Sequence, residues 1–94
     1  MKKKTNTEFS DVYLDETKEK LLSAGDACLM AILHDPENEL SFDEKLKRFK
    51  LREKFLPGGE IELFPEDLVE LKKLVSGFPF SIIATGRICE WIDG

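Results

Sequence analysis

The side chains that could support catalysis are few and scattered. Cys28 and His34 come closest to a nucleophile and its base. Six positions along one helix place them about 240° apart around its axis, so they would not face each other. Glu66 and Glu70 share a helix face, but the sequence places no apolar pocket beside them, which acid–base catalysis by a carboxyl group needs. We therefore do not expect an enzyme.

The acidic residues between two predicted helices invite comparison with a calcium-binding loop. Asp35, Glu37 and Glu39 occupy the first, third and fifth positions of such a loop. Leu40 follows where the turn needs glycine, and Leu46 stands where calcium needs a bidentate glutamate. The single histidine of the chain leaves no histidine pair for zinc. We predict neither a metal nor a cofactor.

A basic segment, residues 45–54, dominates the charge distribution. It holds six lysine and arginine side chains and one acidic residue, a local charge of +5 in a chain whose net charge is −5. One interpretation is a solvated face balanced by acidic neighbours such as Glu66 and Glu70. The other is a docking face for phosphate or an acidic partner.

Two apolar residues, one within this segment and one directly after it, favour the docking interpretation. The helical period places Leu51 and Phe55 roughly opposite the expected core stripe, and a basic helix with an extra apolar spot is a common protein-binding surface. We therefore predict a partner-binding surface made by Lys47, Arg48, Leu51, Lys54 and Phe55.

Two residues near the C-terminal end extend this prediction. Trp91 is the only tryptophan, and it either covers the core or anchors an interface. Trp and Arg are the side chains most enriched at the centres of interfaces. Arg87 lies toward the same side of the predicted helix, so we add Arg87 and Trp91 to the partner-binding surface.

Length and composition bound the remaining possibilities. The 94 residues suit one domain with a modest core. Without Lys2, Lys3 and Lys4, the chain has 11 basic and 19 acidic residues, a net charge of −8, which argues against direct nucleic-acid binding. No apolar run approaches the length of a membrane span, and no apolar segment follows the N-terminal lysines as in a signal peptide. We expect a cytoplasmic protein whose Cys28 and Cys89 are buried thiols.

The sequence predicts a mainly α fold. Residues 1–10 read as a flexible N-terminal arm, and residues 11–94 as a single helical domain. Residues 11–14 suggest a short strand, although residues 17–22 equally suit an extension of the next helix. Ser23 is a good N-cap for a buried central helix over residues 24–34, which Pro36 ends.

Three further helices follow in the prediction. Ser41 and Glu44 form a capping box for a helix that ends near residue 54. Residues 61–63 suit a short strand pairing with residues 12–14. Pro65 begins a helix over residues 65–76, and a last helix covers residues 81–92. The predicted fold is a compact four-helix domain with at most one short two-stranded β element.

Helical periodicity also assigns the core faces. We expect one buried row in each of the last three helices, and Gly86 to permit a close crossing of two helices. These rows are Phe42, Leu46, Phe49 and Leu56; Leu68, Leu71, Leu74 and Val75; and Ile82, Thr85, Ile88, Cys89 and Ile92.

Sequence blocks over residues 41–92 carry a resemblance to known proteins. The blocks are residues 44–49, 58–63 and 66–73, and residues 86–91 stand where the relatives have a Gly-x-Ala-x-x-Leu-Leu type helix. On these blocks, about half of the chain resembles short, uncharacterised proteins encoded by phages and prophages. Phe64-Pro65 departs from the Ser or Thr N-cap usual there. The resemblance implies a phage-type origin and a protein partner.

These observations favour a small, acidic, non-enzymatic protein-binding module. We expect it to act as an inhibitor or adaptor of a host or phage protein, in the host cytoplasm if it is phage-encoded. One alternative is a self-associating structural or assembly protein. The other is a nucleic-acid-related role, through the basic helix over residues 45–54 or through an acidic surface that mimics DNA.

Overall fold

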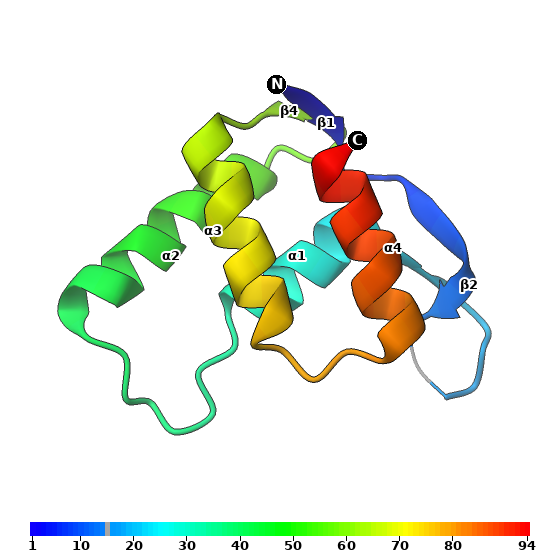
Figure 1. Cartoon of the computed structure of the whole chain (residues 1–94), viewed down its shortest axis with the longest axis horizontal. Coiled ribbons are helices and arrows are strands. Elements are labelled where there is room, and N and C mark those ends of the chain that lie inside the picture. The colour runs from blue at the N-terminus through cyan, green and yellow to red at the C-terminus, as the bar shows by residue number, and fades with distance from the viewer. Residues whose placement is uncertain (15) are drawn as a thin grey trace.

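The computed structural model describes residues 1–14 and 16–94, along which short strands and helices are interspersed (Figure 1). The strands are β1 (Lys2–Lys4), β2 (Glu8–Tyr13), β3 (Leu21–Ser23) and β4 (Glu60–Glu62). The helices are α1 (Ala24–Ile32), α2 (Phe42–Phe55), α3 (Pro65–Ser76) and α4 (Ile82–Asp93).

The described residues therefore form four helices and two small two-stranded antiparallel sheets, a mixed α/β arrangement. The predicted mainly α, four-helix domain with at most one strand pair is wrong. Its helices are present, but β1, β3 and β4 have three residues each, too few to leave a detectable alternation of apolar and polar side chains, and the six residues of β2 bury only Phe9 and Val12, three positions apart.

The first ten residues, which we expected to form an arm, contribute β1 and part of β2. Strand β1 pairs with β4, with Lys3 opposite Ile61, whereas β2 pairs with β3. The predicted pairing of residues 61–63 with residues 12–14 is therefore wrong. The alternative in which residues 17–22 extend the first helix is also wrong, because the chain enters α1 directly from β3.

Lys3 explains why a run of lysines can join the folded structure. Its side chain is buried, and its Nζ donates a hydrogen bond of 2.8 Å to the backbone oxygen of Trp91. The same Nζ lies 5.7 Å from the centroid of the Trp91 ring. A buried ammonium is stable only when it is paired in this way, so these contacts tie β1 to α4.

Helix α1 lies at the centre and packs against α2, α3 and α4 (Figure 1). Ser23 caps it as predicted, because its hydroxyl oxygen accepts a hydrogen bond of 3.2 Å from the Asp26 amide. The helix ends at Ile32 rather than at residue 34. Met30 is exposed, so α1 is not buried on every side as its composition suggested.

Helix α2 packs with the opposite face from the one we expected. The inward residues are Leu51 and Phe55, which are 5% and 3% exposed. Phe42 and Phe49, from the predicted core row, are 77% and 53% exposed. The buried side chains of α2 come from its C-terminal part. Because a helix is rigid, these residues determine which face of the whole helix points inward.

Arg48 holds α2 in this orientation. Its Nη1 donates hydrogen bonds of 2.7 Å to the backbone oxygen of His34 and 3.3 Å to that of Ile32. These carbonyls lie at the C-terminal end of α1, where backbone oxygens lack helical partners and a positive charge is favourable. Arg48 must therefore face α1, which leaves Phe49 on the outside.

The last two helices match their predicted positions closely. In α3 the row Leu71, Leu74 and Val75 is buried, as predicted. In α4 the predictions for Ile88 and Ile92 are confirmed, but Ile82 is 91% exposed. A side chain placed on Gly86 would meet nothing within 4 Å. The predicted close helix crossing at Gly86 is therefore wrong within the described chain.

Candidate functional site

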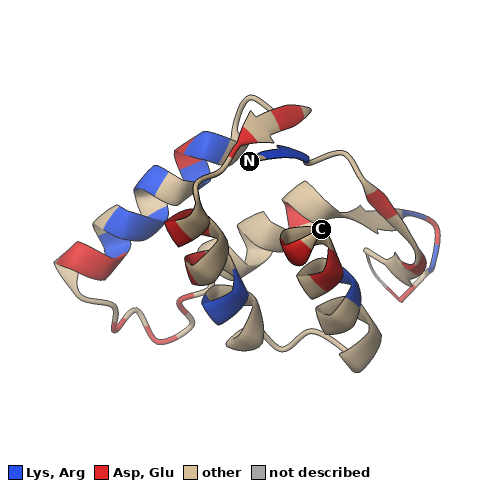
Figure 2. Cartoon of the chain, turned by 45° about the horizontal axis from the view of Figure 1, so that its top comes forward, with Lys and Arg blue, Asp and Glu red and all other residues tan. Residues whose placement is uncertain are grey.

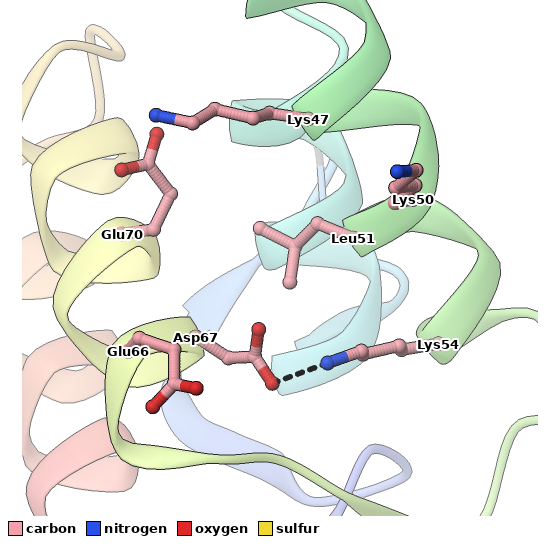
Figure 3. A pocket seen from close by; sticks show the side chains of 7 residues that line it. All are labelled: Lys47, Lys50, Leu51, Lys54, Glu66, Asp67 and Glu70. Atoms are coloured by element: carbon pink, nitrogen blue, oxygen red, sulfur yellow. Dashed lines mark hydrogen bonds and ion pairs between the residues drawn. The ribbon is translucent and has the colours of Figure 1, made fainter.

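A charged groove of about 410 Å³ runs between α2 and α3. Lysines from α2 form one wall, carboxylates from α3 form the other, and Leu51 lies between them (Figure 3). The residues that line it are Lys47, Lys50, Leu51, Lys54, Glu66, Asp67 and Glu70. In Figure 2 the basic residues run along α2, whereas acidic residues lie on the neighbouring α3.

Among the described residues, one ion pair joins the two walls of this groove. Lys54 Nζ lies 2.6 Å from Asp67 Oδ2 and 4.9 Å from the centroid of the Phe64 ring. Lys47 extends toward Glu70 in Figure 3, and its Nζ lies 4.0 Å from Glu44 Oε1 on its own helix. Glu70 Oε1 is buried and has no hydrogen-bond partner in the described structure. The acidic neighbours therefore balance the basic face in part, and a phosphate here would sit among carboxylates.

The predicted partner-binding residues of α2 do not form one surface. Leu51 and Phe55 belong to the core, so their assignment as partner contacts is wrong. Arg48 turns toward α1, and Lys54 is paired with Asp67. Of the five predicted residues, Lys47 and Lys54 reach the groove as charged side chains, because the five span an arc of about 120° around the helix.

Arg87 and Trp91 lie on α4, away from the α2–α3 groove. Arg87 donates hydrogen bonds of 3.1 Å to Asp11 Oδ1 and 3.0 Å to Asp11 Oδ2, which join α4 to β2. The hydrogen bonds from Arg87 lower the pKa of the Asp11 carboxyl. The Trp91 indole donates a hydrogen bond of 3.2 Å to the backbone oxygen of Lys4. Both side chains therefore connect structural elements.

An apolar row on the outside of α2 has no counterpart among the predicted site residues. We define the outer stripe as Phe42, Leu46, Phe49 and Leu56, all of which are exposed. The helical period places these four residues within one arc of about 80°, opposite Leu51. The sequence revealed this row, but its periodicity could not tell an outward row from an inward one.

Basic residues line one edge of the outer stripe, and the other edge carries both signs of charge. Lys45 and Arg52 lie along the first edge, whereas Asp43 and Lys50 lie along the second. Glu53 falls within the arc of the stripe, and its carboxylate lies 4.0 Å from Arg52 Nη1. The N-terminal half of the outer stripe is therefore apolar, with a cationic border on the side of Lys45 and Arg52.

A hollow of about 340 Å³ opens beside the outer stripe, between α2 and the chain that follows α1. Leu33, Leu40 and Phe49 supply much of its apolar lining. Lys45 and Arg52 also line it, and Lys45 Nζ donates a hydrogen bond of 3.1 Å to Asn38 Oδ1. We call this space the α1–α2 hollow. It combines an apolar lining with cations beside it.

Metal-ligating side chains and two cysteine thiols are the other reactive groups of the described chain. Among residues 1–14 and 16–94, no group of three or more His, Cys, Asp or Glu side chains could hold a metal ion. Cys28 and Cys89 are free thiols, and burial raises the pKa of Cys28 to about 12. Such a thiol carries almost no thiolate at neutral pH and is a poor nucleophile.

No helix in the described part of the chain is both long enough and apolar enough to cross a bilayer. Comparisons with protein-family models, with curated proteins and with solved structures found no match to this chain. The resemblance to phage and prophage proteins therefore stays a prediction, and the function must be argued from the geometry of the surface.

Proposed function

We propose that this chain is a small, non-enzymatic protein-binding module that docks a partner on the outer stripe of α2. The single observation that carries the proposal is the exposure of Phe42, Leu46, Phe49 and Leu56 along one helix. We further propose a phage-type origin and a cytoplasmic site of action, where the module inhibits a protein or adapts one protein to another.

The physical support is the hydrophobic cost of leaving this row in water. Single exposed apolar side chains are ordinary, but a row such as Phe42, Leu46 and Phe49 on one face of a helix is typical of an interaction surface. Burying a side chain such as Phe or Leu contributes about 1.5–3 kcal/mol. An amphipathic row with this spacing is the kind that helix-mediated complexes bury.

Affinity capture with a matched control tests this proposal. We would compare the wild type with Phe42→Ser/Phe49→Ser on α2 and with Ile82→Ser/Ile83→Ser on α4, as tagged proteins in lysate of the natural host. All four side chains are exposed, so we expect all three proteins to fold with similar thermal stability.

We expect the α4 variant, but not the α2 variant, to retain the protein captured by the wild type. Calorimetry with the purified partner should reproduce the difference. Equal capture by the wild type and the α2 variant would contradict docking on the outer stripe.

Self-association is the second candidate, and an observation on α4 favours it. Ile82 and Ile83 are exposed beside Gly86, and these residues border a hollow of about 250 Å³. An exposed isoleucine at the border of a hollow can fit the same hollow in a second copy related by a two-fold axis. Sedimentation velocity over a range of concentrations would reveal a dimer, and Ile82→Ser should abolish it.

A further inference from the structure

We infer that the partner presents an acidic amphipathic helix to α2, with apolar residues along the outer stripe and one anchoring side chain in the α1–α2 hollow. This inference rests on the proposed function, because it names the chemistry of the partner that the outer stripe would bind. Three properties of the surface lead to it: the charge of its borders, the shape of the hollow and the length of the stripe.

The borders of the stripe determine the charge of the partner. Lys45 and Arg52 flank one edge of an apolar centre, so carboxylates along that edge of a partner helix would meet opposite charge. The other edge holds Lys50 and the acidic Asp43, and Glu53 lies inside the arc of the stripe. We therefore expect the partner to be acidic along the edge that meets Lys45 and Arg52, and to carry basic residues opposite Asp43 and Glu53.

The α1–α2 hollow determines where the partner inserts its anchor. Its lining from Leu33, Leu40 and Phe49 suits an apolar side chain. Lys45, Arg48 and Arg52 outnumber the one carboxylate of the hollow, Asp35. An apolar anchor with a neighbouring carboxylate fits this combination, since interface energy concentrates where a side chain fills a pocket.

The length of the stripe suits a helix. The rise from Phe42 to Leu56 is about 21 Å, or about four helical turns. Helices that bind helices present side chains at intervals of three and four residues, which is the spacing of Phe42, Leu46 and Phe49.

The overall charge favours a protein over a lipid surface as the occupant. Basic, apolar helices also bind anionic membranes. Here, however, the chain has a net charge of −5, and the carboxylates of Asp43 and Glu53 lie on the same side of α2 as the outer stripe. An anionic membrane would face these acidic groups as well, whereas a partner helix can place basic residues opposite them.

The test uses a pair of synthetic peptides and the full-length protein. One peptide is a 16-residue amphipathic helix with a leucine row and glutamates along one edge of that row, and the other replaces every glutamate with lysine. Fluorescence anisotropy with labelled peptides measures binding at low salt. We expect the acidic peptide to bind at least about tenfold more tightly than the basic one.

A matched pair of charge reversals locates the contact. Lys45→Glu/Arg52→Glu should weaken binding of the acidic peptide by about tenfold or more, and Phe49→Ser should weaken it as well. Lys18→Glu/Lys20→Glu changes the net charge by the same amount in the exposed loop before β3 and should bind like the wild type. Added salt should weaken the wild-type complex.

Several outcomes would overturn the inference. They are equal binding of the two peptides, no binding of either, or unchanged binding by Lys45→Glu/Arg52→Glu. Vesicles of phosphatidylserine and phosphatidylcholine that bind the wild type more tightly than the acidic peptide does would identify a lipid surface instead. Lysate capture that depends on Phe42 and Phe49 without peptide binding would leave the proposed function intact and reject only the acidic helix.

Discussion

Both sides of α2 carry Leu and Phe side chains, but one side is buried and the other is exposed. Leu51 and Phe55 face the core and are buried, whereas Phe42 and Phe49 face outward on the same helix. Helix α4 repeats this pattern, since Ile88 is buried and Ile82 is almost fully exposed. The difference shows that α2 and α4 carry more apolar side chains than the core buries. We expect the exposed apolar side chains to contact other molecules.

The largest effect should come from truncating matched phenylalanines on the two sides of α2. Phe55→Ala leaves a cavity in the core and should reduce the free energy of unfolding by about 3–5 kcal/mol. Phe49→Ala removes an exposed ring and should change it by no more than about 0.5 kcal/mol. Urea denaturation of the two variants measures the difference.

The opposite result would restore the orientation predicted from the sequence. If Phe49→Ala destabilised the chain strongly and Phe55→Ala did not, α2 would bury the face that the periodicity first suggested. The inference about a partner helix would then lose its surface. Circular dichroism of the native variants checks that both remain helical.

We expect a smaller difference in the free energy of unfolding between alanine variants of two arginines that lie one helical turn apart. Arg48→Ala removes the hydrogen bonds to the carbonyls of His34 and Ile32 and should cost about 2 kcal/mol, since hydrogen bonds from a charged donor are strong. Arg52→Ala removes only a 4.0 Å contact with Glu53 and should cost less than about 1 kcal/mol.

Thermal or urea unfolding of both arginine variants tests this difference. Equal stability losses would mean that Arg48 does not fix the orientation of α2 against α1. A loss confined to Arg48→Ala would support its role in turning the outer stripe toward solvent.

The sequence predicts the helices well because their signals are local. Ser23 and Ser41 cap α1 and α2 as their hydroxyl groups suggest, and Pro65 begins α3. The strands predicted at residues 11–14 and 61–63 overlap β2 and β4, whereas β1, β3 and both strand pairings escape prediction, because these short strands are defined by their partners. Lys3 has no apolar character, and only the position of Trp91 in the folded chain makes its burial favourable.

The candidate site is harder to predict because it depends on the direction in which α2 packs. Periodicity identifies two opposite apolar rows on α2, but it does not say which of them faces the core. The hydrogen bonds from Arg48 to the end of α1 decide this, but they cannot be predicted from the sequence. They join residues 14 and 16 positions apart, so only tertiary structure reveals them.

We expect the smallest change in stability from a substitution on the outer face of α4. Gly86 lies within an exposed helix, and a methyl group there would meet nothing within 4 Å. Glycine costs about 0.5–1 kcal/mol relative to alanine in such a position, so Gly86→Ala should stabilise the chain by about that amount. Urea denaturation of the two proteins at equal concentration would measure the gain.

The Gly86→Ala variant also tests whether Gly86 is needed for self-association. If Gly86→Ala stabilises the monomer and leaves sedimentation unchanged, the hollow beside Ile82 has no role in self-association, and α2 alone carries the binding surface. If it stabilises the monomer yet weakens a dimer, the methyl group has filled a hollow that a second copy needs, and α4 is a second contact surface. Destabilisation would instead mean that this face of α4 is covered within the molecule.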